Sequence, residues 1–164
     1  MSNEYGRKLA KTGLELGSIR LSPEEPFLWA SGYYMPIYND NRMLLTKPAY
    51  RKLVAEGFAG LMEREGIEAD VIAGTATAGI PHATSLSDYL DLPLTYVRNK
   101  PKGHGLQNQI EGLSKDRDYD GRKVVLIEDL ISTGGSSINA VEAIRNAGGE
   151  VSYCLSIFNY GLDA

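Results

Sequence analysis

Residues 124–137 read VVLIEDLISTGGSS and form the most informative stretch of the chain. Its apolar start, 124–127, has the composition of a buried strand, because a strand covered on both faces is apolar throughout. Two adjacent carboxylates, Glu128 and Asp129, follow where the strand leaves the sheet. A loop of small residues comes next and leads into a helix that we predict over 136–147. Ligands bind at this carboxyl end of the strands in open parallel sheets, so the stretch predicts a fold class and a site together.

The loop after the acidic pair has the features of a phosphate-binding site. Gly134 and Gly135 let the backbone come close to an anion, and free N–H groups at the start of the helix point toward it. The hydroxyls of Ser132, Thr133 and Ser136 add donors. The carboxylates repel phosphate but suit the hydroxyls of a ribose, directly or through a magnesium ion. The stretch therefore predicts a sugar-phosphate site; the structural alternative is a glycine turn, a helix capped by Ser136 and two solvated acids.

Short apolar strands and helices alternate through the rest of the chain. We expect strands at 71–73, 94–97, 124–127 and 151–158, and helices at 3–16, 48–65, 81–90 and 136–147. Thr46 is the expected cap of the second helix, and Gly66 is its expected end. Ile138, Val141 and Ile144 are expected on the inner face of the last helix. The pattern predicts an α/β fold, with a parallel sheet flanked by helices on both faces.

Composition bounds the class of protein. The chain has 164 residues, of which 43% are hydrophobic and 23% charged, and this suits one domain with its own core. Within it we expect an N-terminal segment over about 1–45 and an α/β core over about 46–164. A net charge of -4 argues against nucleic-acid binding, and neither a membrane-spanning apolar run nor a secretory signal is evident. The single cysteine, Cys154, excludes an internal disulfide, and we interpret it as a reduced core thiol in a cytoplasmic protein.

A second glycine-containing loop follows another predicted strand. It comprises Thr75, Ala76, Thr77, Ala78 and Gly79. Small residues and backbone N–H donors between a strand and a helix suit a second anion. This signal is weak alone, since such a turn commonly holds no ligand. His82, just beyond it, is interpreted as a structural residue rather than a ligand.

The connection between Arg98 and Asp120 has about twenty residues and few apolar side chains, and connections of this length in a compact domain are usually functional or disordered. It carries Arg98, Lys100, Lys102 and His104, a cationic cluster on an acidic protein. A solvated basic loop is the structural alternative. We favour a loop that stabilises charge on a leaving group and closes to exclude water.

These motifs resemble those of the type I phosphoribosyltransferases, and among them the orotate phosphoribosyltransferases. Residues 124–137 resemble the family's phosphoribosyl pyrophosphate motif, and 70–82 its pyrophosphate loop. Residues 97–105 resemble the mobile catalytic loop of the orotate enzymes, and Ser31-Gly32 with 36–42 their N-terminal signature. The resemblance implies the type I phosphoribosyltransferase fold with a small N-terminal hood region.

The resemblance also implies an activity and a set of ligands. The activity is transfer of a phosphoribosyl group from phosphoribosyl pyrophosphate to orotate, giving orotidine 5′-monophosphate and pyrophosphate in pyrimidine (UMP) biosynthesis. The implied catalytic residues are Lys102, Arg98 and His104, which also bind phosphoribosyl pyrophosphate. The other implied ligands of this substrate are Glu128, Asp129, Leu130, Ile131, Ser132, Thr133, Gly134, Gly135 and Ser136, and Ser132 is also implied to contact orotate. Mg2+ held mainly by the substrate, near the acidic pair, and a homodimer with shared active sites are implied as well.

The chain departs from the family pattern in two ways. Ala30, Ala78 and Asn99 stand where many members have lysine, and a base-contacting arginine of some members falls near Asn159. The chain stops at Ala164, where members usually continue, so we expect the C-terminal part of the hood to be absent or truncated. The substitutions bear on the residue map more than on the activity, and the early C-terminus bears on turnover more than on sugar-phosphate binding.

Three alternatives stay open at this point. One is a purine-base salvage phosphoribosyltransferase, although 98–104 and the signature at 40–42 favour orotate. Another is a regulator that senses phosphoribosyl pyrophosphate with the same fold. Such a regulator would need a DNA-binding domain or a basic face, and a short acidic chain offers neither. The last is an inactive subunit, which the early C-terminus leaves possible.

Overall fold

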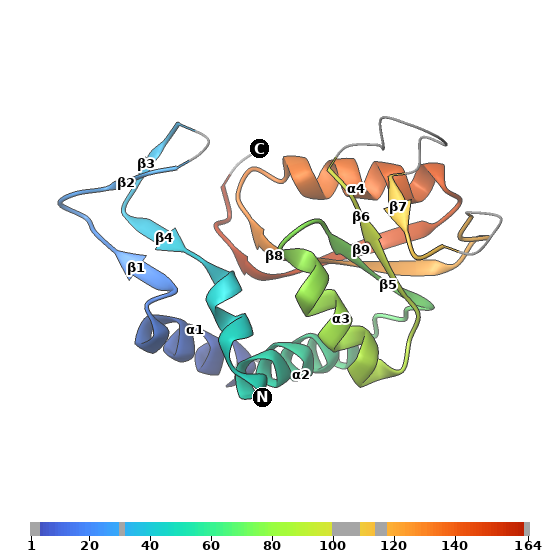
Figure 1. The fold of residues 1–164 in the computed structure, drawn as a ribbon, viewed down its shortest axis with the longest axis horizontal. Coiled ribbons are helices and arrows are strands. Elements are labelled where there is room, and N and C mark those ends of the chain that lie inside the picture. The colour runs from blue at the N-terminus through green and yellow to red at the C-terminus, as the bar shows by residue number, and fades with distance from the viewer. Residues whose placement is uncertain (1–3, 30–31, 100–108, 114–117, 163–164) are drawn as a thin grey trace. The chain divides into compact units, whose positions relative to one another are not determined.

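The computed structural model describes residues 4–29, 32–99, 109–113 and 118–162. The chain divides into two compact units, Met1–Leu53 and Val54–Ala164. Figure 1 shows the sheet in the second unit, which carries both predicted anion loops.

The first unit contains helices and two small antiparallel sheets. Its elements are α1 (Glu4–Leu16), β1 (Ile19–Leu21), β2 (Phe27–Leu28), β3 (Tyr34–Met35), β4 (Ile37–Asn39) and η1 (Asn41–Thr46). β1 pairs with β4, and β2 with β3. The guanidinium carbon of Arg20 lies 5.3 Å from the centre of the Phe27 ring and 4.9 Å from that of Tyr38, so one cation connects the two sheets. The helix predicted at 3–16 is confirmed, whereas these strands, of two or three residues each, were too short to predict.

Helix α2 (Pro48–Glu65) begins in the first unit and ends in the second. The prediction that Thr46 caps it is wrong, because Thr46 belongs to η1 and its hydroxyl donates to the carbonyl of Met43 at 2.8 Å. The prediction that Gly66 ends it is confirmed. Gly66 has a φ of 63°, and the N–H of Ile67 donates back to the carbonyl of Met62 at 2.8 Å.

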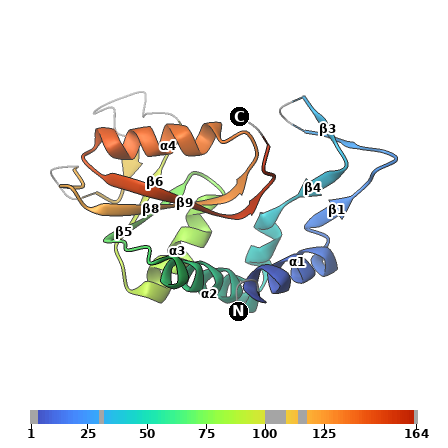
Figure 2. The ribbon, with the colours of Figure 1, turned by 180° about the vertical axis from the view of Figure 1, so that it is seen from behind.

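The second unit is a five-stranded sheet in the order β7-β6-β5-β8-β9. The strands are β5 (Val71–Thr75), β6 (Leu94–Val97), β7 (Ile110–Glu111), β8 (Lys123–Ile131) and β9 (Glu150–Asn159). All are parallel except the short edge strand β7. Helix α4 (Gly135–Asn146) covers one face, and α3 (Gly79–Leu90) lies on the other (Figures 1 and 2). The predicted parallel sheet with helices on both faces is confirmed.

Strand β8 is longer than predicted. It does not end at Ile127, although its pairing with β5 does. On its other side β9 continues to pair with it as far as Ile131, which lies opposite Asn159. Glu128 and Asp129 therefore lie on the part of β8 that pairs with β9 but no longer with β5. The pairing with β9 holds their backbone in place at the open edge of the sheet.

The buried face of α4 is also different from the prediction. Ile138 is 55% exposed, so its expected inward position is wrong, whereas Ile144 is completely buried. The buried positions are Ser137, Ala140 and Ile144, which recur at helical spacing. Small residues at the first two positions let the start of α4 approach the sheet. The helix ends at Asn146, one residue before the predicted end at Ala147, which is its C-cap, and Gly148 follows with a φ of 75°.

The connection after Arg98 is less open than its composition suggested. Ile110 lies in β7 and is 2% exposed, and Tyr119 is completely buried. The Tyr119 hydroxyl is hydrogen-bonded to the Thr95 hydroxyl on β6 at 2.8 Å. Both ends of the predicted loop are therefore fixed to the core.

His82, on α3, is completely buried, which agrees with a structural role. Neither ring nitrogen has a hydrogen-bond partner among the described residues. Burial lowers the pKa of His82 to about 4, although the charge of nearby Asp129 acts in the opposite direction. The imidazole is therefore neutral in the folded protein at neutral pH.

This neutral histidine should make the fold sensitive to acid. The lowered pKa means that, between pH 6.5 and 4, the unfolded chain binds a proton that the folded chain does not, so stability is lost as pH falls. We predict that the difference in unfolding free energy between His82→Leu and the wild type moves in favour of the variant by about 2 kcal/mol from pH 7 to pH 5. Urea unfolding at both pH values measures it, and other titrating groups cancel because both proteins share them. A difference that stays constant with pH would contradict the assignment.

Candidate active site

The two predicted anion loops meet at the carboxyl ends of β5 and β8, which are adjacent in the sheet. They line one pocket of about 370 Å³. The residues lining it are Ala76, Thr77, Ala78, Glu128, Asp129, Leu130, Ile131, Ser132, Thr133, Gly134, Gly135, Ser136 and Ser137. Parallel pairing produces this meeting, because Gly74 lies opposite Ile127 and the residues after both leave the sheet at the same edge.

Gly79, the first residue of α3, allows the close approach of the two loops. A Cβ atom at this position would lie 2.5 Å from both the Ile127 carbonyl oxygen and the Thr75 hydroxyl oxygen. It would also lie 3.5 Å from the Cα of Glu128. The Thr75 hydroxyl donates to the same carbonyl at 3.4 Å. A side chain at Gly79 would push α3 and the 76–78 loop away from the acidic pair.

Gly134, in the loop that follows the acidic pair, directly precedes α4. It has a φ of 80°, in the left-handed region that favours glycine, and is the N-cap of the helix. No side chain caps this helix, so the alternative in which Ser136 is the cap is wrong. The first N–H groups of a helix have no partner inside it. The N–H groups of α4 that follow Gly134 therefore line the pocket as donors for an anion.

Glu128 and Asp129 form a tight acidic pair. Glu128 is 6% exposed, and its Oε1 accepts a hydrogen bond from the Asp129 N–H at 3.0 Å. Burial raises the pKa of Glu128 to about 7, and a side-chain hydrogen bond with Asp129 adds to the rise, while the Thr75 hydroxyl opposes it. A hydroxyl donor or a cation placed against the pair would favour its charged form. The pair is thus suited to bind sugar hydroxyls or a divalent ion.

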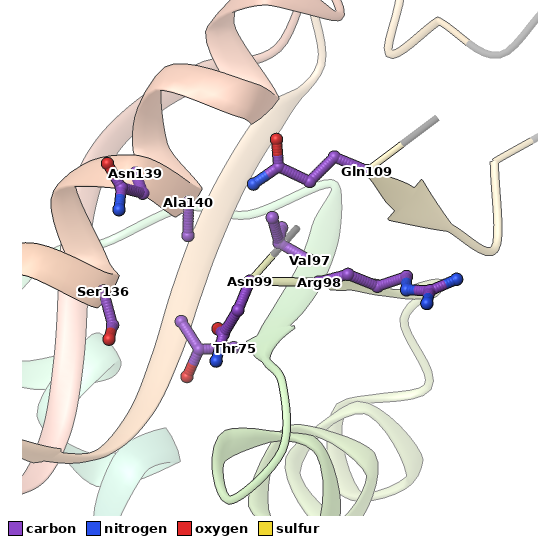
Figure 3. A pocket seen from close by; sticks show the side chains of 8 residues that line it. All are labelled: Thr75, Val97, Arg98, Asn99, Gln109, Ser136, Asn139 and Ala140. Atoms are coloured by element: carbon purple, nitrogen blue, oxygen red, sulfur yellow. The ribbon is translucent and has the colours of Figure 1, made fainter. Parts of the chain in front are cut away.

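A second pocket, of about 170 Å³, lies between β6 and α4 (Figure 3). It is lined by Thr75, Val97, Arg98, Asn99, Gln109, Ser136, Asn139 and Ala140. Ser136 lines both pockets, so the two adjoin. Gln109 and Asn139 were not predicted as site residues from the sequence. The latter could have been found, since it follows Ser136 by three positions and shares its helix face.

Arg98 has a different position from the other lining residues. Figure 3 shows its side chain extending away from Thr75, Asn99 and Asn139. Its guanidinium lies 3.5 Å from the carboxylate of Glu111 on β7.

The remaining predicted site residues fall into two groups. Lys100, Lys102 and His104 lie outside the described residues, as do Ala30 and Ser31. Asn159, which stands where some family members have a base-contacting arginine, ends β9 opposite Ile131, and its side-chain oxygen accepts from the Gly161 N–H at 2.8 Å.

The described residues contain no group of three or more His, Cys, Asp or Glu side chains that could hold a metal ion. A divalent ion at Glu128 and Asp129 would therefore need most of its ligands from elsewhere, as Mg2+ commonly takes them from substrate phosphates and water.

None of the described helices has the length and apolar character needed to cross a membrane.

Comparisons with known proteins agree with this geometry. The Phosphoribosyl transferase domain family matches residues 40–160. The chain is 54% identical over 158 residues to the orotate phosphoribosyltransferase of Listeria innocua, and the match covers 96% of this chain and 73% of that one. The crystal structure of orotate phosphoribosyltransferase from Aeropyrum pernix superposes with a TM-score of 0.79 at 30% identity, covering 93% of this chain and 82% of that chain. Adenine phosphoribosyltransferase from Saccharomyces cerevisiae, at 18% identity, shares the fold, with a TM-score of 0.70 and coverage of 94% and 88%. The chain therefore belongs to the phosphoribosyltransferase family and, within it, to the orotate phosphoribosyltransferases.

Proposed function

We propose that this chain transfers the phosphoribosyl group of phosphoribosyl pyrophosphate to orotate, forming orotidine 5′-monophosphate and pyrophosphate in pyrimidine biosynthesis. The observation that carries the proposal is the single pocket in which 76–78 and 128–137 face each other. Two strand-to-helix loops and an acidic pair that line one pocket match a ribose that has a phosphate group at each end. The orotate specificity rests on membership of the orotate enzymes.

Each part of the substrate has a matching part of the pocket. The 5′-phosphate fits the loop 132–136 and the N–H groups at the start of α4. The ribose hydroxyls are donors, and they fit the carboxylates of Glu128 and Asp129, which would repel a phosphate. The pyrophosphate then lies toward 76–78. We also propose the contact between Ser132 and orotate that the family resemblance implies.

The reaction breaks the bond from the anomeric carbon to a pyrophosphate oxygen and forms a bond from that carbon to a ring nitrogen of orotate. A ribosyl cation-like transition state needs stabilisation of the departing anion rather than a protein nucleophile. Burial raises the pKa of the Cys154 thiol to about 11, so the thiol is protonated at neutral pH and is a poor nucleophile. Arg98, Lys102 and His104 are the proposed source of positive charge for the leaving group.

Mg2+ is part of the proposal as a substrate-borne ion. Glu128 and Asp129 would hold it together with oxygens of phosphoribosyl pyrophosphate. When bound, it would neutralise charge on the leaving pyrophosphate.

The position of Arg98 supports an active site shared between two copies of the chain. Its side chain extends away from the residues that line its own chain's pocket, as expected of a residue that reaches a partner's substrate. Two-fold dimers are the commonest symmetric assembly. We propose such a homodimer. We also propose a cytoplasmic location, with which the free thiol of Cys154 agrees.

A spectrophotometric assay of orotate consumption tests the proposed function. We predict that absorbance from orotate falls only when phosphoribosyl pyrophosphate and Mg2+ are both present, because the leaving group's charge must be neutralised. Adenine, xanthine and uracil serve as competing bases. Consumption of a purine but not of orotate would contradict the base specificity and leave the sugar-phosphate site intact.

A mixed-dimer experiment tests the shared site. Lys102→Ala removes a proposed charge on the leaving group, and Asp129→Asn removes a carboxylate contact to ribose, so each variant should be inactive by itself. After the two are unfolded, mixed equally and refolded, random pairing makes about half of the dimers mixed, and about a quarter of all sites would be intact. We predict recovery of about a quarter of wild-type activity.

Mass spectrometry of the refolded mixture supplies the control, because it shows whether mixed dimers have formed. A mixture that contains mixed dimers and stays as inactive as its parents would show that each loop serves its own chain.

A further inference from the structure

The side of the sheet on which Arg98 lies is set by burial along β6. Thr95 and Val97 are 3% and 2% exposed, and side chains alternate along a strand. Val97 therefore faces the core under α4, and Arg98, one position on, faces the other way. Figure 3 shows the result, with Val97 and Asn99 at the pocket and the Arg98 guanidinium turned away from it.

Glu111 is brought to Arg98 by the register of the two edge strands. β6 and β7 are antiparallel, with Tyr96 opposite Glu111, and the Arg98 N–H donates to the Gln109 carbonyl at 2.8 Å. Arg98 and Glu111 are therefore diagonal neighbours, within reach of each other's long side chains. Their charged atoms lie 3.5 Å apart, and the side chains are 37% and 26% exposed. An ion pair of this length, between two partly solvent-exposed side chains, is weak enough for a stronger anion to replace the carboxylate.

We propose that Glu111 is a positioning residue that competes with pyrophosphate for Arg98. This inference rests on the proposed function, which gives Arg98 a pyrophosphate group to bind. In the free protein the Glu111 carboxylate holds the guanidinium in an ion pair beside β7. When pyrophosphate is present, whether in the same chain or in a second copy, the guanidinium exchanges one anion for the other.

The competition has a consequence for turnover. Every interaction that binds pyrophosphate more tightly also slows its release as a product. A carboxylate that takes Arg98 back lowers the affinity for the pyrophosphate group, in the product as in the substrate. Glu111 thus favours product release.

Calorimetric titration of the full-length protein with Mg2+-pyrophosphate tests the inference. Glu111→Gln keeps the shape of the side chain and removes its charge, so we predict that pyrophosphate binds about twofold to fivefold more tightly, the range expected for an exposed ion pair. Glu65→Gln is the matched control, since it changes the net charge equally and removes the carboxylate that lies 2.7 Å from Arg64, away from both pockets. It should leave pyrophosphate affinity unchanged.

The Arg98→Gln background separates competition from a general effect of charge. If Glu111 acts through Arg98, Glu111→Gln has no effect on affinity once Arg98 is replaced. The inference is overturned if Glu111→Gln binds pyrophosphate no more tightly than the wild type, or if it gives the same gain in the Arg98→Gln background. In either case, binding of pyrophosphate by the wild type leaves the proposed function standing. If the wild type binds neither Mg2+-pyrophosphate nor phosphoribosyl pyrophosphate, the proposed function fails, and the role of Glu111 fails with it.

Discussion

Parallel pairing of β5 with β8 is the constraint on which the site depends. The pairing places Gly74 opposite Ile127, so the segments that follow both strands leave the sheet at one edge. Gly79 then lets α3 start directly against the backbone of β8, where a Cβ would lie 2.5 Å from a carbonyl oxygen. The fold itself thereby holds both loops at the pocket, and this lowers the ordering cost of binding.

The pocket has both groups that attract an anion and groups that repel one. The first N–H groups of α4 lie on one side of the pocket, and the acidic pair lies on the part of β8 that only β9 supports. Burial makes the pair costly to keep charged, which is why the pKa of Glu128 rises to about 7. Ribose hydroxyls or a substrate-borne cation would offset this cost, so the same carboxylates that disfavour a bare phosphate favour a phosphorylated sugar.

Much of this arrangement could be predicted from the sequence, because strong local patterns carry it. The apolar run before Glu128 and the glycine loop after it identify a strand, a ligand edge and a helix start. What could not be predicted depends on partners far away in the sequence. β8 extends to Ile131 because β9 continues beside it, and Ile138 is exposed because Ser137 and Ala140 face the sheet instead. The turn of Arg98 toward Glu111 follows from a register between β6 and β7 that no local pattern reveals.

One substrate is proposed to span the two loops, with its ribose at the acidic pair. A crystal structure of the protein with Mg2+ and phosphoribosyl pyrophosphate would show this arrangement. We predict the 5′-phosphate within hydrogen-bond distance of the N–H groups of Gly135 and Ser136, and the ribose hydroxyls at the carboxylates of Glu128 and Asp129. Pyrophosphate oxygens should lie against 76–78. A phosphate bound away from the start of α4, or a ribose turned away from the acidic pair, would contradict the account.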